Sequence, residues 1–133
     1  MSQHNDYHPN YLKGIEYFNE CDFFEAHEVW EELWSEEQGP SRLFYKGLIQ
    51  AAVCLHHFGN GNLRGTTKLY HGCRKYLEAY LPKHLGLDLE QLLSEMETCC
   101  AEVLACQDQA SRIEIDPELM PEIHLEPPPQ PRD

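Results

Sequence analysis

Residues 23–34 read FFEAHEVWEELW, a stretch that combines aromatic side chains with acidic ones. At about 100° per residue, a helix through this stretch gathers one histidine and three aromatic side chains within a narrow arc: Phe23, His27, Trp30 and Trp34. Glu31 falls on the edge of that arc, and the other glutamates lie on the far side. The pattern predicts an amphipathic helix with a histidine in the middle of its apolar face.

His27 and Glu31 stand four residues apart, so their side chains stack one helical turn above each other and can share a divalent metal ion. A hydrolytic site needs three protein ligands and an open position for water, so one more ligand must come from another helix. His57 is the preferred third ligand because it shares a helix flank with Gln50, and His71 is the next choice. Zinc, manganese or iron would suit this set, with Glu31 as the candidate catalytic residue.

Two alternatives stand beside the metal site. In the first, His27 is a buried histidine hydrogen-bonded to Glu31, while Trp30 and Trp34 pack the core, and the pair fixes how the helices pack. In the second, the same residues form a metal-free site that binds a ligand or performs acid–base chemistry.

Four further residues are candidate ligand-binding groups. Trp34 and Gln50 lie next to the predicted site, although a polar side chain such as Gln50 among apolar neighbours often satisfies a backbone group instead. Arg64 and Lys68 form a local positive charge that would suit an anionic substrate, and the alternative is that they simply face water.

Helical periodicity and capping signals divide the chain into five predicted helices followed by a tail. The helices are expected at about 9–19, 22–39, 41–58, 63–81 and 88–109, the third being apolar nearly all round and therefore central. From residue 111 onward, isolated apolar residues alternate with prolines. The sequence thus predicts an all-α, compact single-domain bundle over residues 1–110 and an extended Pro-rich tail over residues 111–133.

The composition limits which partners the protein is expected to bind and where in the cell it is expected to be. The formal net charge of −13 over 133 residues opposes nucleic acid and anionic membrane surfaces, because both attract basic proteins. The longest apolar run, 48–55, is too short to cross a bilayer, and the first residues do not read as a signal peptide. A cytoplasmic protein is expected, with six cysteines that mostly act as small core residues: Cys21, Cys54, Cys73, Cys99, Cys100 and Cys106.

Three segments together resemble a known protein family: residues 24–34, residues 46–53 and the pair Gly61-Asn62. They are similar to the uncharacterised bacterial and archaeal family numbered three hundred and nine among the domains of unknown function, which has an HxxxExxW or HxxxExxY signature. Here the signature falls on His27, Glu31 and Trp34. The resemblance covers about residues 11–80 and implies a compact all-helical fold and a metal-dependent hydrolase.

Two functions follow as predictions. The first is a metal-dependent hydrolase of a small, anionic substrate, working in an enclosed pocket at His27 and Glu31. The alternative is a non-catalytic helical module that binds a small ligand, a protein partner or a second copy of itself, so a homo-oligomer is compatible with the sequence.

Overall fold

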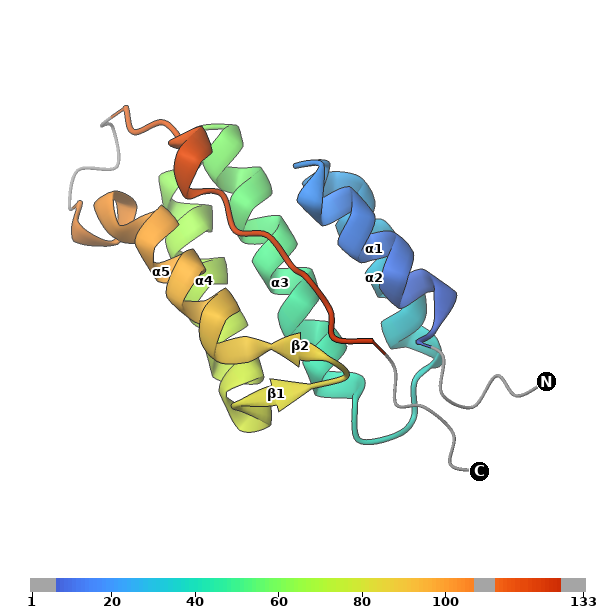
Figure 1. Cartoon of the computed structure of the whole chain (residues 1–133). Helices are drawn as coiled ribbons and strands as arrows, with labels where there is room; N and C mark the ends of the chain where they lie inside the picture. The colour runs from blue at the N-terminus through green and yellow to red at the C-terminus, as the bar shows by residue number, and fades with distance from the viewer. Residues whose placement is uncertain (1–6, 107–111, 128–133) are drawn as a thin grey trace, which may run out of the picture.

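The computed structural model describes residues 7–106 and 112–127. Within these ranges the chain forms five α-helices: α1 (Pro9–Asn19), α2 (Phe23–Glu36), α3 (Arg42–Gly59), α4 (Leu63–Leu77) and α5 (Leu89–Ala105). The predicted compact all-α domain is confirmed (Figure 1). The predicted boundary near residue 110 lies outside the described residues.

Helix α3 is the centre of the bundle, as its sequence predicts. It lies between the α1–α2 pair and the α4–α5 pair (Figure 1). Six of its side chains have no exposed surface at all: Phe44, Leu48, Ala51, Ala52, Cys54 and Leu55. Small residues let α4 approach closely, since a Cβ at Gly47 would collide with Leu77. Because α3 is buried on most of its sides, both helix pairs pack against it.

The segment between α4 and α5 differs from the prediction of a single helix over residues 63–81. Helix α4 ends at Leu77 and is followed by a short 3-10 helix, η1 (Glu78–Tyr80). A two-stranded antiparallel hairpin, β1 (Lys83–His84) and β2 (Leu87–Asp88), then leads into α5. Leu85 and Gly86 both have positive φ at its turn, a turn shape that two-residue hairpins favour. Strands of two residues leave no periodic signal in the sequence.

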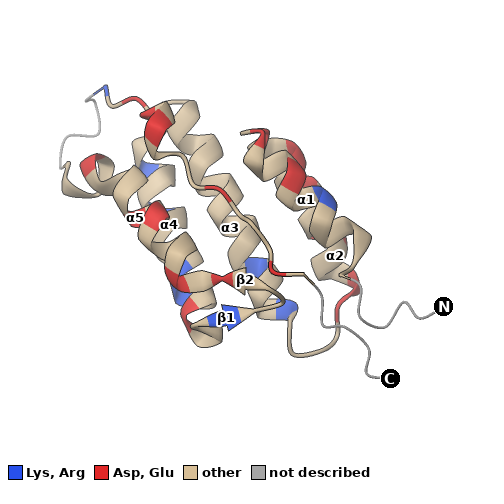
Figure 2. Ribbon diagram, viewed as in Figure 1, with Lys and Arg blue, Asp and Glu red and all other residues tan. Residues whose placement is uncertain are grey.

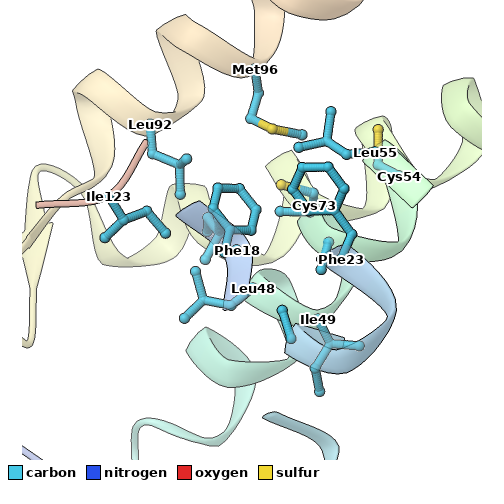
Figure 3. Packing of buried hydrophobic residues seen from close by; sticks show 14 of the residues in the cluster. Phe18, Phe23, Leu48, Ile49, Cys54, Leu55, Cys73, Leu92, Met96 and Ile123 are labelled. Atoms are coloured by element: carbon cyan, nitrogen blue, oxygen red, sulfur yellow. The ribbon is translucent and has the colours of Figure 1, made fainter. Parts of the chain in front are cut away.

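The core joins side chains from all five helices and from the tail. Figure 3 shows Phe18, Phe23 and Leu48 packed with Leu92, Met96 and other apolar residues. The rings of Phe18 and Phe23 meet edge to face with centroids 5.3 Å apart, a preferred aromatic geometry.

The cysteines largely occupy the core, as predicted. Cys54, Cys73, Cys99 and Cys100 are buried free thiols, whereas Cys21 is exposed. Burial raises the pKa of Cys73 to about 12, so this thiol stays protonated and unreactive at neutral pH.

Residues 112–127 pack against the bundle and include a second short 3-10 helix, η2 (Pro117–Leu119). The segment is the orange-to-red part of the chain that crosses the helices in Figure 1. The Asn19 side chain forms two hydrogen bonds of 2.8 Å with the backbone of Ile123, one to its carbonyl and one from its N–H. Ile123 itself is buried, and the N–H of Glu126 donates to the Gly86 carbonyl at 2.9 Å. This part of the predicted tail therefore contributes to the core.

Acidic residues dominate the described surface, and the first two turns of α3 carry a local positive charge (Figure 2). Among the described residues, no helix is both long and apolar enough to cross a membrane.

Candidate functional site

Helix α2 buries a stripe that differs from the arc predicted from the sequence. Its buried residues are Phe23, Ala26, Trp30 and Leu33. Trp30 is fully buried, and its indole N–H donates to the Tyr11 carbonyl of α1 at 3.3 Å. The stripe is therefore centred on Ala26 and Trp30, where α2 meets its neighbours most closely.

The signature is less deeply buried than the sequence predicts. His27 and Trp34 are only partly buried, at the edge of the stripe, and Glu31 is exposed. An open groove of about 410 Å³ lies at the start of α2 and the end of α3, and its walls include Phe24 and His56 but none of the three signature residues. A helical wheel gives the angular spacing of side chains but not the direction of the neighbouring helices, so it misplaces the centre of the buried face.

The His27 ring has a defined orientation on α2. Its Nδ1 lies 2.8 Å from the carbonyl oxygen of Phe24. A carbonyl only accepts hydrogen bonds, so Nδ1 carries the hydrogen and Nε2 is left facing two carboxylates. The distances from Nε2 are 3.7 Å to Glu28 Oε2 and 4.0 Å to Glu31 Oε2.

These distances argue against the alternative of a buried, hydrogen-bonded His27–Glu31 pair. Both exceed the range of a hydrogen bond, and the Glu31 side chain is 54% exposed while that of His27 is 19% exposed. In the structure, therefore, His27 and Glu31 do not form a buried, hydrogen-bonded pair. They form a partly solvated cluster that Glu28 joins.

The predicted third ligand, His57, points to the other side of α3. Its Nδ1 is 3.2 Å from the amide nitrogen of Asn62, and a Cβ at Gly65 would lie 2.8 Å from its ring. The neighbouring His56 lies nearer to the signature, because the Phe24 ring is 5.8 Å from the His56 ring and 5.2 Å from the His27 ring.

No set of three ligands is assembled around His27. Within residues 7–106 and 112–127, no group of three or more His, Cys, Asp or Glu side chains is arranged to hold a metal ion. His71, the second choice as third ligand, is exposed on α4 beside the Tyr70 ring. The carboxylates near His27 in the described part of the chain, those of Glu28 and Glu31, both come from its own helix.

The remaining predicted residues lie along α3 and α4. The Gln50 amide fills the space beside Gly72, because a Cβ at Gly72 would overlap its Oε1 atom. Gln50 therefore lies at the contact between α3 and α4. Arg64 and Lys68 are exposed on α4.

Trp34 has the most unusual surroundings in α2. Its ring packs against two cations from the start of α3, with the Arg42 Cζ atom 4.1 Å and the Lys46 Nζ atom 4.8 Å from the ring centroid. These are cation–π contacts. The indole Nε1 is buried and has no hydrogen-bond partner, and it is the one buried side-chain nitrogen or oxygen in that condition among the described residues.

The neighbouring cations cannot satisfy this donor. Arginine and lysine side chains only donate hydrogen bonds, so neither Arg42 nor Lys46 offers an acceptor to the Trp34 N–H. A buried polar group without a partner is rare and calls for an explanation. Sequence reasoning missed both cations, although their spacing of four residues places them on one face of α3.

Comparison with known proteins assigns the first half of the chain. The family model described as a domain of unknown function, DUF309, matches residues 11–69. Residues 11–69 are thus similar to the DUF309 family. The DUF309 segment runs from α1 into α4 and contains His27, Glu31 and Trp34 together with Arg42 and Lys46.

Two relatives extend the comparison. An uncharacterized protein of Bacillus subtilis (strain 168), YpuF, is 34% identical over 87 residues, which are 63% of this chain and 50% of the Bacillus protein. An uncharacterized protein of Aquifex aeolicus (strain VF5) is 43% identical over 53 residues, which are 38% of this chain and 16% of the Aquifex protein. The match thus spans half or less of the length of these relatives.

Proposed function

We propose that this protein is a helical binding module that binds a small anion at the junction of α2 and α3. The observation that carries the proposal is the Trp34 indole N–H, which is buried without an acceptor beside Arg42 and Lys46. An anionic oxygen is an acceptor for that N–H and a counter-ion for both cations.

The electrostatics of the junction support an anion in spite of the acidic chain. Arg42 is the first residue of α3 and Lys46 lies one turn further on. The positive end of the helix macrodipole adds to their charge. The Nε1 atom is covered, so a ligand reaches it only when neighbouring side chains move. Arg42 and Lys46 are long and partly exposed, so they can swing away from the ring to admit an anion.

Titration calorimetry with inorganic phosphate tests the proposal. Trp34→Phe keeps an aromatic ring and removes the N–H, and it should weaken phosphate binding about tenfold or more, since a hydrogen bond to a charged group contributes about 1.5–3 kcal/mol. Lys46→Gln should weaken binding and reduce its dependence on salt. Lys68→Gln is the matched control, because Lys68 is exposed on α4. Equal phosphate binding by Trp34→Phe and the unaltered protein would refute the proposal.

A second candidate function is the metal-dependent hydrolase, which one specific observation favours. The His27 Nδ1–H···O=C bond to Phe24 fixes the ring so that Nε2 faces Glu28 and Glu31. Histidines that bind metal commonly donate their other ring N–H in this way. His27 and Glu31 would hold the ion, and a bound divalent metal would lower the pKa of its water. The fit is incomplete, since His57 does not join them in a three-ligand group.

Metal content decides between these two functions. In protein purified without a histidine tag, the hydrolase proposal expects stoichiometric zinc, manganese or iron and a melting temperature that rises when the metal is added. His27→Gln should abolish that rise. His71→Gln, which alters an exposed histidine of α4, should leave it intact. Absence of both stoichiometric metal and thermal stabilisation would remove the metal-dependent candidate and leave the anion-binding module.

A further inference from the structure

A serine and a histidine far apart in the sequence meet at the start of α3. Ser41 directly precedes α3 and His84 lies in β1. The distance from Ser41 Oγ to His84 Nε2 is 2.9 Å. Both side chains are partly exposed. A hydroxyl within hydrogen-bond reach of an imidazole is the arrangement that activates a serine nucleophile.

The His84 ring is held in place by aromatic neighbours. Its centroid lies 4.7 Å from the Phe44 ring and 4.7 Å from the Tyr80 ring. The Tyr80 hydroxyl in turn donates to the Pro40 carbonyl at 2.6 Å, which ties η1 to the residue before Ser41. Partial burial lowers the pKa of His84 below its ordinary value. The imidazole is therefore neutral at neutral pH and free to accept a proton.

The backbone beside Ser41 supplies donors. Ser41 is the N-cap residue of α3, yet its side chain makes no capping hydrogen bond. An N-cap oxygen normally accepts from the second or third N–H of its helix, and here these belong to Leu43 and Phe44. The Ser41 side chain therefore leaves these two donors at the N-terminus of α3 unused and contacts His84 instead.

We propose that Ser41 and His84 form a nucleophile–base pair that hydrolyses carboxylic esters with a small acyl group. Ser41 Oγ attacks the carbonyl carbon while its proton passes to His84 Nε2. The ester C–O bond then breaks, and the alcohol leaves with that proton. Water attacks the acyl-serine in the same way, which releases the acid and restores the Ser41 hydroxyl.

This inference stands apart from the proposed anion site. It rests on the Ser41–His84 contact, whereas the anion site rests on the indole N–H of Trp34. Phosphate binding by Trp34→Phe tests the anion site, and labelling of Ser41→Ala tests the nucleophile–base pair. The two proposals can fail independently.

Labelling with a fluorophosphonate probe, followed by peptide mass spectrometry, tests the pair. The probe should form an Oγ–P bond at Ser41 with loss of fluoride. Ser41→Ala should abolish this adduct, and His84→Gln should slow its formation by about 100-fold or more, the usual contribution of a general base. Ser35→Ala is the matched control, since the Ser35 hydroxyl donates to the Glu32 carbonyl of its own helix.

A second readout uses p-nitrophenyl acetate. The unaltered protein should release p-nitrophenol in a burst equal to the protein concentration and carry an acetyl group on Ser41. Circular dichroism and melting temperature establish that the variants are folded; if His84→Gln unfolds, Ser41→Ala and the position of the adduct decide alone. An adduct elsewhere, labelling of Ser41→Ala at the original rate, or a folded His84→Gln variant within twofold of the unaltered protein would overturn the proposal.

Discussion

The surroundings of the two tryptophans of α2 differ although Trp30 and Trp34 lie one helical turn apart. Trp30 is fully buried against α1, and its indole N–H donates to the Tyr11 carbonyl. Trp34 is partly exposed, its ring lies against Arg42 and Lys46, and its N–H has no acceptor. Tryptophan thus stabilises the fold at position 30, whereas at position 34 its indole N–H is a hydrogen-bond donor without an acceptor. The neighbouring helix, α1 or α3, decides which role each tryptophan takes.

The largest expected effect is the loss of stability when Trp30 is truncated. Trp30→Ala should lower the free energy of unfolding by about 3–5 kcal/mol, because it leaves a large cavity. Trp34→Ala should cost only roughly 1 kcal/mol, since part of that ring is already in water. Urea unfolding of both variants measures the difference. Equal losses would break the contrast between the two sites.

A smaller loss should follow when the Trp30 site is overfilled. Gly14 of α1 leaves room for the indole, and a Cβ there would overlap the Trp30 ring. Gly14→Ala should cost about 1–3 kcal/mol. Gly59→Ala is the control, because its added Cβ meets no atom within 4 Å among the described residues outside its own stretch of helix backbone. That control should change stability by less than about 1 kcal/mol, in the stabilising direction. The comparison of Gly14→Ala with Gly59→Ala by thermal unfolding tests how tightly α1 and α2 pack.

Replacing each tryptophan by phenylalanine, which removes the indole N–H and part of the ring, should distinguish the two positions further. Trp34→Phe should change the free energy of unfolding by less than about 1 kcal/mol, since it deletes a buried donor that has no partner. Trp30→Phe should cost more, because it loses both the bond to Tyr11 and fully buried volume. Chemical denaturation of this pair gives the answer. A larger loss at position 34 would mean that the Trp34 N–H has an acceptor in solution.

The smallest effect is expected at His84, which contacts Ser41 just before the helix that carries Arg42 and Lys46. Burial lowers the pKa of His84 below its ordinary value near 6.5. The unfolded chain then binds a proton more readily than the folded one, so this contribution to stability is present above pH 6.5 and is lost as the pH falls through the lower, folded-state pKa. The difference in stability between the unaltered protein and His84→Gln should shrink between pH 7.5 and pH 5. A constant difference would contradict the assignment.

The helices were largely predictable from the sequence because each has its own period and end signals. Helix α3 is apolar on most sides and is central, and Asp88 caps α5 by accepting from the Gln91 N–H at 3.0 Å. Local signals of this kind need no knowledge of the rest of the fold. The hairpin over residues 83–88 has no such signal and was missed.

The candidate site was only partly predictable. The spacing of His27 and Glu31 correctly places them on one side of α2. Their exposure depends on the direction from which α1 and α3 approach, which no single-helix pattern contains. The packing of Arg42 and Lys46 against Trp34 depends on how the chain turns between α2 and α3. Long-range placement therefore limits what the sequence can tell about the site.

The central claim is that the Trp34 N–H is available to an anionic ligand and the Trp30 N–H is not. The chain contains two tryptophans, so its ¹H–¹⁵N NMR spectrum should contain two indole signals. Single Trp→Phe variants assign them. Titration with inorganic phosphate should shift the Trp34 signal in a saturable way and leave the Trp30 signal in place. A Trp34 signal that does not move, or equal shifts of both signals, would contradict the account.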